Sequence, residues 1–122
     1  MHQKMLLVDD HTRSLKNIAY FLRGEGFEVH EAPDGNEAAQ LLEKIGFDLI
    51  VSDLRMPGLD GFRLLACARA VRPDIPVVLM SGCDNVNLDQ VDKGGLTKFV
   101  EKPIDLEELL SKVRQALQGP RT

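Results

Sequence analysis

A chain of 122 residues has the length of one domain, and we expect residues 1–122 to form it, with 119–122 as a tail or the start of a linker. Hydrophobic residues make up 43% and charged residues 28%, as in soluble globular proteins, and no apolar run approaches the roughly 20 residues of a membrane helix. The net charge of −4 argues against direct nucleic-acid contact, and the N-terminus has no signal-peptide pattern, so we expect a cytoplasmic protein without membrane contact.

The first part of the chain predicts a strand, a helix and a second strand. Residues 5–8 are apolar and stop at Asp9 and Asp10, which indicates a short buried strand that ends in carboxylates. Apolar residues then recur at helical spacing up to about Gly24. The alternation in residues 27–31 suggests a strand near a sheet edge.

A second helix and a central strand follow. Asp34 and Glu37 resemble an N-terminal capping pair, and Gly46 closes the helix. The unbroken apolar run 49–51 predicts a parallel strand buried on both faces, and it stops at Asp53. The proline and glycines that come next mark a loop.

The third helix is expected at about 61–71, and a fourth buried strand at 77–80 ends at Ser81. The helix is predicted from apolar positions at helical spacing, with Arg69 continuing the row: Phe62, Leu65 and Ala66. Residues 84–93 are rich in Asn and Asp, so we expect only a short or irregular helix there.

The chain closes with a fifth strand and a last helix. Residues 99–100 form a short strand that ends at Lys102, and Asp105 with Glu108 resembles another capping pair. Gly119 and the proline after it stop the helix. Strands that alternate with helices in this way imply a parallel sheet with helices on both faces.

Four of the five predicted strands end in residues that can do chemistry: Asp9 and Asp10, Asp53, Ser81, and Lys102. In a parallel sheet these ends share one edge, so the side chains become neighbours. Clustered carboxylates repel one another unless a cation lies among them, and Mg²⁺ prefers oxygen ligands of this kind. A lysine and a hydroxyl nearby suit phosphoryl transfer, in which an aspartate can be the nucleophile.

Four segments together resemble the receiver domain of two-component response regulators over residues 4–117. They are LLVDD (6–10), DLIVSDLRMPGLDG (48–61), VVLMSG (77–82) and KFVEKP (98–103). The resemblance implies an α/β, flavodoxin-like five-stranded parallel sheet of order 2-1-3-4-5 with five helices, the fourth of them short or irregular.

The resemblance also implies a phosphoacceptor switch rather than an enzyme with an outside substrate. Asp53 would accept a phosphoryl group from the phosphohistidine of a sensor histidine kinase or phosphotransfer protein. Mg²⁺, for which Mn²⁺ could substitute, would be held directly by Asp10, largely through water by Asp9, and by Asp53 and the backbone carbonyl of Arg55. Lys102 would contact the phosphoryl group. The domain would catalyse only its own phosphotransfer and dephosphorylation.

Further assignments come from the same resemblance. Ser81 would hydrogen-bond to the attached phosphoryl group, and Phe99 would turn inward as Ser81 moves. The bond before Pro103 would be cis. Arg55 and Cys83 occupy positions that tune the lifetime of the phosphate. The surface that changes would engage an output domain or protein not identified by the sequence, and a phosphorylation-dependent homodimer is compatible with this role.

Simpler roles stay open for several of these residues. Asp9 and Asp10 could cap the first helix, Ser81 and Lys102 could be ordinary turn and surface residues, and Phe99 could be plain core. His11 follows the two carboxylates, but Mg²⁺ prefers oxygen, so capping or surface packing is expected there rather than ligation.

Three other function classes compete with the switch. A metal-dependent phosphohydrolase would need a second acid or base near Asp53, but Arg55 stands two residues beyond it, and no insertion could form a lid. A flavin-binding protein of flavodoxin type would need a phosphate-binding loop after the first strand, where Asp9 and Asp10 would repel phosphate. A receiver-like interaction domain that works without phosphorylation is also open.

Overall fold

The computed structural model describes residues 2–82 and 96–118, in which strands and helices alternate. The strands are β1 (Lys4–Val8), β2 (Glu28–Ala32), β3 (Leu49–Asp53), β4 (Val77–Ser81) and β5 (Thr97–Glu101). The helices are α1 (Thr12–Gly24), α2 (Gly35–Lys44), α3 (Gly61–Val71) and α4 (Leu106–Gln118). All strand pairs are parallel and the order is β2-β1-β3-β4-β5, which confirms the predicted sheet.

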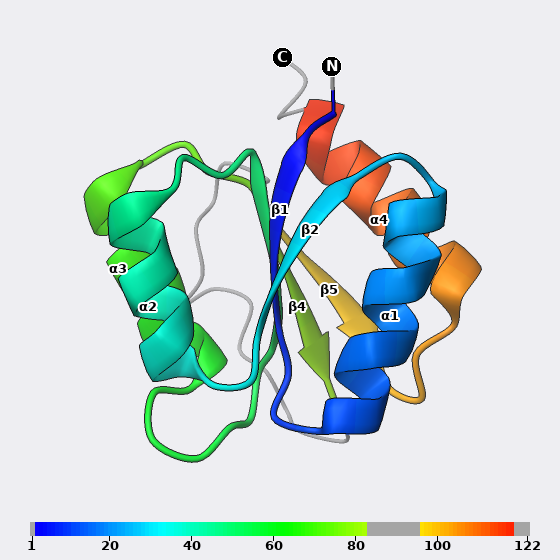
Figure 1. Cartoon of the computed structure of the whole chain (residues 1–122), viewed down its shortest axis with the longest axis horizontal. Coiled ribbons are helices and arrows are strands. Elements are labelled where there is room, and N and C mark those ends of the chain that lie inside the picture. The colour runs from blue at the N-terminus through cyan, green and yellow to red at the C-terminus, as the bar shows by residue number, and fades with distance from the viewer. Residues whose placement is uncertain (1, 83–95, 119–122) are drawn as a thin grey trace.

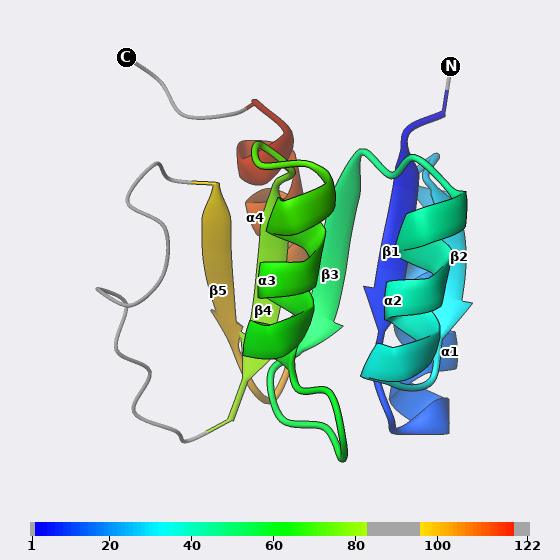
Figure 2. The ribbon, with the colours of Figure 1, turned by 90° about the vertical axis from the view of Figure 1, so that its left-hand side faces the viewer.

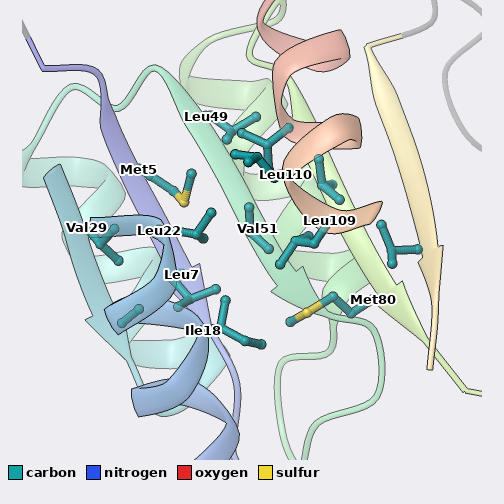
Figure 3. Packing of buried hydrophobic residues seen from close by; sticks show 14 of the residues in the cluster. Met5, Leu7, Ile18, Leu22, Val29, Leu49, Val51, Met80, Leu109 and Leu110 are labelled. Atoms are coloured by element: carbon teal, nitrogen blue, oxygen red, sulfur yellow. The ribbon is translucent and has the colours of Figure 1, made fainter. Parts of the chain in front are cut away.

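Two layers of helices cover the sheet, α1 and α4 on one face and α2 and α3 on the other (Figure 1). Successive residues of a strand point to opposite faces. Met5 and Leu7 therefore join the core beneath α1 and α4, where Figure 3 shows them facing Leu22 of α1. Leu6 and Val8 join the core beneath α2 and α3. Both faces of β1 are buried, which explains why its sequence is apolar without alternation.

Aspartates begin three of the helices by satisfying backbone N–H groups that have no partner within the helix. Asp34 accepts a hydrogen bond from the Glu37 N–H (2.8 Å), and Asp60 accepts one from the Arg63 N–H (2.9 Å). Asp105 accepts from the N–H groups of the second and third residues after it, at 2.9 and 3.3 Å. The predicted caps at Asp34 and Asp105 are confirmed; the cap at Asp60 was not predicted.

The third helix is confirmed with the predicted bounds, and its buried face differs from the row of apolar positions that predicted the helix. Gly61, Leu64 and Ala68 are the buried residues of α3, whereas Phe62 is 38% exposed and Ala66 lies on the surface. The helix carries apolar residues on nearly every side, so the spacing of apolar positions alone did not define which face meets the sheet.

Some predictions lie outside the described residues: the short helix at 84–93, the lifetime position Cys83 and the tail at 119–122. Of the five predicted helices, four are seen in the part of the chain that the structure describes, so the predicted number is only partly matched. Within those same residues, no helix is both long and apolar enough to cross a membrane.

The carboxyl ends of the strands define one edge of the molecule. Figure 2 shows the arrowheads of β1, β3, β4 and β5 pointing to it, with the loop that joins β3 to α3 beyond them. Val8 pairs with Ser52 across β1 and β3, and Ser81 pairs with Glu101 across β4 and β5. The residues that follow each strand are therefore brought to the same edge.

Candidate functional site

A carboxylate and an ammonium group meet at the centre of this edge. Asp53 is the last residue of β3 and is buried, and Lys102 directly follows β5. The Lys102 Nζ lies 2.9 Å from Oδ1 and 2.9 Å from Oδ2 of Asp53, so the ammonium group spans both carboxylate oxygens. The Lys102 backbone N–H donates to the Ser81 carbonyl (2.7 Å), which holds the end of β5 against β4. The Lys102–Pro103 peptide bond is cis.

Two more carboxylates and an imidazole stand beside this pair. One ligand atom from each of Asp9, Asp10, His11 and Asp53 lies within 4.8 Å of those from the other three. Asp9 is buried, and its Oδ1 accepts a hydrogen bond from the His11 backbone N–H (2.9 Å). Burial raises the pKa of the Asp9 carboxyl above its ordinary value; the hydrogen bond opposes this rise, and the Asp53 charge adds to it.

The donor atoms of this acidic group fit a divalent cation. Asp10 Oδ1 is shielded from solvent and accepts no hydrogen bond among the described residues. The nearest imidazole nitrogen, His11 Nδ1, lies 3.3 Å away, but the contact lacks hydrogen-bond geometry. A shielded carboxylate oxygen without a donor is unfavourable, and a metal ion would satisfy it.

Helix capping does not account for the acidic pair. His11 is the residue that precedes α1, and its side chain makes no capping hydrogen bond. Of the two roles expected for His11, capping or surface packing, capping by the side chain is therefore not seen, and 71% of the side chain is exposed. Asp9 does accept the His11 backbone N–H, which is a turn-like contact before the helix. Asp10 has no such contact among the residues described. A role in beginning the first helix therefore accounts for part of the contacts of Asp9 and for none of those of Asp10.

The remaining predicted residues lie around the site without joining the ion pair. Ser81 is buried at the end of β4, and its hydroxyl has a long contact (3.4 Å) with the Gly82 carbonyl. Phe99, on β5, is half-buried and packs against the core beneath α2 and α3. Arg55 is exposed in the loop after β3.

Sequence reasoning missed a groove next to the site. It has a volume of about 440 Å³ and runs from the acidic group between the start of α1 and the segment that joins β5 to α4. Its lining combines site residues with apolar ones: Asp9, His11, Ser14, Asn17, Ile18, Lys102, Pro103, Ile104 and Leu106. No pattern in the sequence marks this groove, which is lined by residues from the start of α1 and from the segment before α4.

The sheet order and the acidic edge are those of a known class of signalling domain. A family model described as the response regulator receiver domain matches residues 5–114. The chain therefore belongs to the family of response regulator receiver domains of two-component systems.

Curated relatives are longer than this chain. It is 33% identical over 115 residues to the transcriptional regulatory protein GlrR of Escherichia coli, covering 93% of this chain and 26% of that protein. It is 34% identical over 114 residues to the heme response regulator HssR of Staphylococcus aureus, covering 93% of this chain and 50% of that protein. The chain thus spans between a quarter and a half of the length of these relatives.

Solved structures match it along nearly its whole length. A response regulator receiver protein from Sinorhizobium medicae has a TM-score of 0.89 at 27% identity, covering 98% of each chain. The receiver domain of the hybrid histidine kinase CckA has a TM-score of 0.79 at 35% identity, covering 94% of this chain and 99% of that one. The chemotaxis protein CheY4 of Vibrio cholerae has a TM-score of 0.83 at 27% identity, covering 95% and 99%.

Proposed function

We propose that Asp53 accepts a phosphoryl group from the phosphohistidine of a sensor histidine kinase or phosphotransfer protein, and that this switches a partner-binding surface. The observation that carries the proposal is the ion pair between the buried Asp53 carboxylate and Lys102, 2.9 Å from both oxygens, beside the carboxylates of Asp9 and Asp10. The protein works in the cytoplasm as a signalling switch and catalyses only its own phosphotransfer and dephosphorylation.

The chemistry needs a carboxylate oxygen that is ionised and held in place. One Asp53 oxygen attacks phosphorus and forms a P–O bond, while the P–N bond of the phosphohistidine breaks and its electron pair returns to the imidazole. Lys102 then pairs with the negative charge that gathers on the phosphoryl oxygens. No proton has to leave Asp53 for this step, so positioning and charge neutralisation provide the catalysis.

A divalent cation completes the charge balance. Asp10 and Asp53 would hold Mg²⁺ directly, Asp9 largely through water, and the Arg55 carbonyl would supply another oxygen. When bound, the ion offsets the charge of the carboxylates and of the incoming phosphoryl oxygens. Mn²⁺ prefers the same oxygen donors and would substitute.

The phosphoryl group brings about −1.5 to −2 charges to the end of β3. Ser81 closes β4 and would turn its hydroxyl toward the new oxygens, and Phe99 would move inward with it. Each ~1.4 kcal/mol of added contact shifts the ratio of inactive to active forms tenfold. The changed surface would then engage an output domain or protein, or a second copy of this chain, without direct contact with nucleic acid.

The test is treatment with a small phosphodonor and Mg²⁺, followed by intact mass measurement. We expect one added phosphoryl group on the native chain and none on Asp53→Ala. Asp74→Ala is the matched control, because Asp74 is an exposed aspartate paired only with Arg72 on the surface among the described residues, and it should be labelled like the native chain. If Asp53→Ala is labelled as much as the native chain, another residue is the phosphoryl acceptor. If the native chain is not labelled, the result favours an interaction domain that works without phosphorylation.

A further inference from the structure

The start of α2 lies against the loop that joins β3 to α3, residues 54–60 (Figure 1). Gly35, the first residue of α2, is buried, and a Cβ added there would overlap the Leu59 carbonyl oxygen. It would also lie 2.8 Å from the Leu59 Cβ and 3.0 Å from the Leu59 carbonyl carbon. The carbonyl atoms are backbone and cannot rotate out of the way. The absence of a side chain at Gly35 therefore lets the loop rest directly on the helix.

The same loop approaches α2 at a second point. It turns at Gly58, whose φ of +76° lies in the left-handed region that favours glycine, and a Cβ there would lie 3.5 Å from the Asn36 Nδ2. Met56 is buried in the core beneath α2 and α3, and Leu59 packs against that core. The middle of the loop therefore rests on α2 and on the core that α2 covers.

The helix and the two ends of the loop are each fixed by other contacts. Ala38 and Leu42 bury one side of α2 in the core. At the ends of the loop, the Leu54 N–H donates to a carbonyl of β4 (2.9 Å), and the Asp60 side chain caps α3. A side chain added at the start of α2 would therefore displace the middle of the loop, residues 55–59, rather than the helix or the loop ends.

Arg55 belongs to this middle part, and the proposed function assigns its carbonyl to Mg²⁺. We infer that Gly35 is a positioning residue for the phosphorylation site: through Leu59, the start of α2 holds the loop where the Arg55 carbonyl can serve the metal ion. The inference rests on the metal site of the proposed function. It adds that α2, whose residues are not among the proposed ligands, sets the affinity for Mg²⁺. Groups that orient metal ligands without touching the metal typically matter by roughly 10- to 100-fold in affinity.

The experiment measures the binding of Mg²⁺ alone to the whole chain by calorimetry, at a temperature at which circular dichroism shows each variant to be folded. Gly35→Ala should weaken the binding by about tenfold, the lower end of that range. Leu42→Ala is the matched control, because it opens a cavity further along the same helix and leaves the contact with Leu59 in place. It should lower the stability of the fold but keep the Mg²⁺ affinity within about twofold of the native value.

Labelling by a small phosphodonor gives a second readout. In Gly35→Ala the Mg²⁺ concentration for half-maximal labelling should rise by about tenfold, while the rate at saturating Mg²⁺ stays within about threefold, because Asp53 and Lys102 keep their places. A merely structural effect would lower the rate at every Mg²⁺ concentration. If Gly35→Ala does not fold, Leu59→Ala tests the same contact from the side of the loop, and the same split between affinity and maximal rate is expected.

Other results overturn the inference. It fails if Gly35→Ala and Leu42→Ala weaken Mg²⁺ binding equally, if neither weakens it, or if Leu59→Ala, used in place of a misfolded Gly35→Ala, binds Mg²⁺ like the native chain. A native chain that is labelled on Asp53, with unchanged Mg²⁺ affinity in Gly35→Ala, defeats only the inference. A native chain whose Mg²⁺ binding depends on Gly35 but which is never labelled defeats only the proposed function.

Discussion

Lys102 is the residue on which the charge balance of the site depends. The Asp53 carboxylate is buried, and the Lys102 ammonium group lies against both of its oxygens. A buried charge that loses its partner keeps its desolvation cost without the compensating attraction. About a third of the Lys102 side chain is exposed, so solvent screens part of this attraction.

Replacing Lys102 with methionine should therefore have two effects. The free energy of unfolding should fall by about 1 to 2 kcal/mol, less than for a fully buried pair, because of that screening. Labelling by a phosphodonor should slow by roughly 100-fold, the usual cost of removing one donor to a developing anion. Urea unfolding and labelling time courses measure the two. Lys98→Met, on the same strand, should change neither, and equal behaviour of the two variants would show that Lys102 has no special role.

The raised pKa of Asp9 makes the free energy of unfolding depend on pH. Burial raises its pKa in the folded protein, so the fold holds the proton more tightly than the unfolded chain does. The tighter proton binding by Asp9 stabilises the fold at a pH below the pKa that Asp9 has in the unfolded chain. This stabilisation is lost as the pH rises through the pKa that Asp9 has in the folded protein. At neutral pH, without a divalent cation, the ionised Asp9 therefore lowers the free energy of unfolding.

Asp9→Asn should relieve this cost while the amide oxygen keeps the hydrogen bond from His11. At pH 7 without divalent cations we expect the free energy of unfolding to rise by about 1 kcal/mol, or roughly 4 °C in Tm. The gain should shrink as the pH approaches the ordinary pKa of aspartate, about 4. Thermal melts across this range measure it. Asp105→Asn keeps an exposed helix cap and should not change Tm in this way; the same rise in both variants would contradict the role of burial.

The sequence predicted which residues meet in the site but not how each side chain is used. A buried strand that stops at a carboxylate or lysine fixes where that residue lies, so the meeting of Asp9, Asp53 and Lys102 followed from the strand ends. The direction of the Ser81 hydroxyl depends on a side-chain rotation that no pattern encodes. The approach of His11 to Asp10 was missed because it depends on how the chain turns into α1, although the two residues are adjacent.

Among the elements, α3 begins directly against the strand that carries Asp53. Its first residue, Gly61, donates its N–H to the Leu54 carbonyl (2.8 Å), and a Cβ on Gly61 would lie 2.8 Å from the Asp53 carbonyl oxygen and 2.8 Å from the Leu54 Cα. Both are backbone atoms, which cannot rotate away. The absence of a side chain at Gly61 thus lets α3 begin directly against the backbone that carries Asp53.

Gly61→Ala should therefore force the start of α3 away from β3. We expect the free energy of unfolding to fall by about 2 to 3 kcal/mol, the cost of overpacking a closed site. Gly46→Ala is the matched control, since a Cβ there meets nothing within 4 Å, and its effect should stay below about 1 kcal/mol. Urea midpoints of the two variants give the comparison. If they coincide, the close approach at Gly61 is not restrictive.

The elements themselves were largely predictable, and the bounds of α3 were too, but its buried face was not. Strands buried on both faces have continuous apolar runs, and the amphipathic helices α1 and α4 have one apolar face each, so both kinds of element stand out in the sequence. In α3 the apolar residues leave no clear polar face, and the buried one is fixed by the contact of Gly61 with β3. That contact is tertiary, so the spacing of apolar residues could not reveal it.

At the scale of the whole molecule, the acidic group joins parts of the sheet that are distant in sequence. Asp9 and Asp10 follow β1 and Asp53 ends β3, so one bound cation would connect these two neighbouring strands inside the sheet. A ligand that binds only the folded form stabilises it by mass action, by about 2.7 kcal/mol at 100 times its Kd. The carboxylates also repel one another without a cation, in a chain whose net charge is already −4.

Mg²⁺ should therefore raise the Tm in proportion to the logarithm of its concentration above Kd, by roughly 10 °C at 100 times Kd. Thermal melts at matched ionic strength, with NaCl replacing MgCl₂, separate binding from general screening, which acts on exposed charges within about 10 Å at 0.1 M salt. Asp10→Asn removes a shielded ligand oxygen and should abolish most of the rise, whereas Asp74→Asn, exposed and remote from the acidic group, should retain all of it. A rise that NaCl reproduces, or that survives Asp10→Asn, would mean that the three carboxylates do not act together as a metal site.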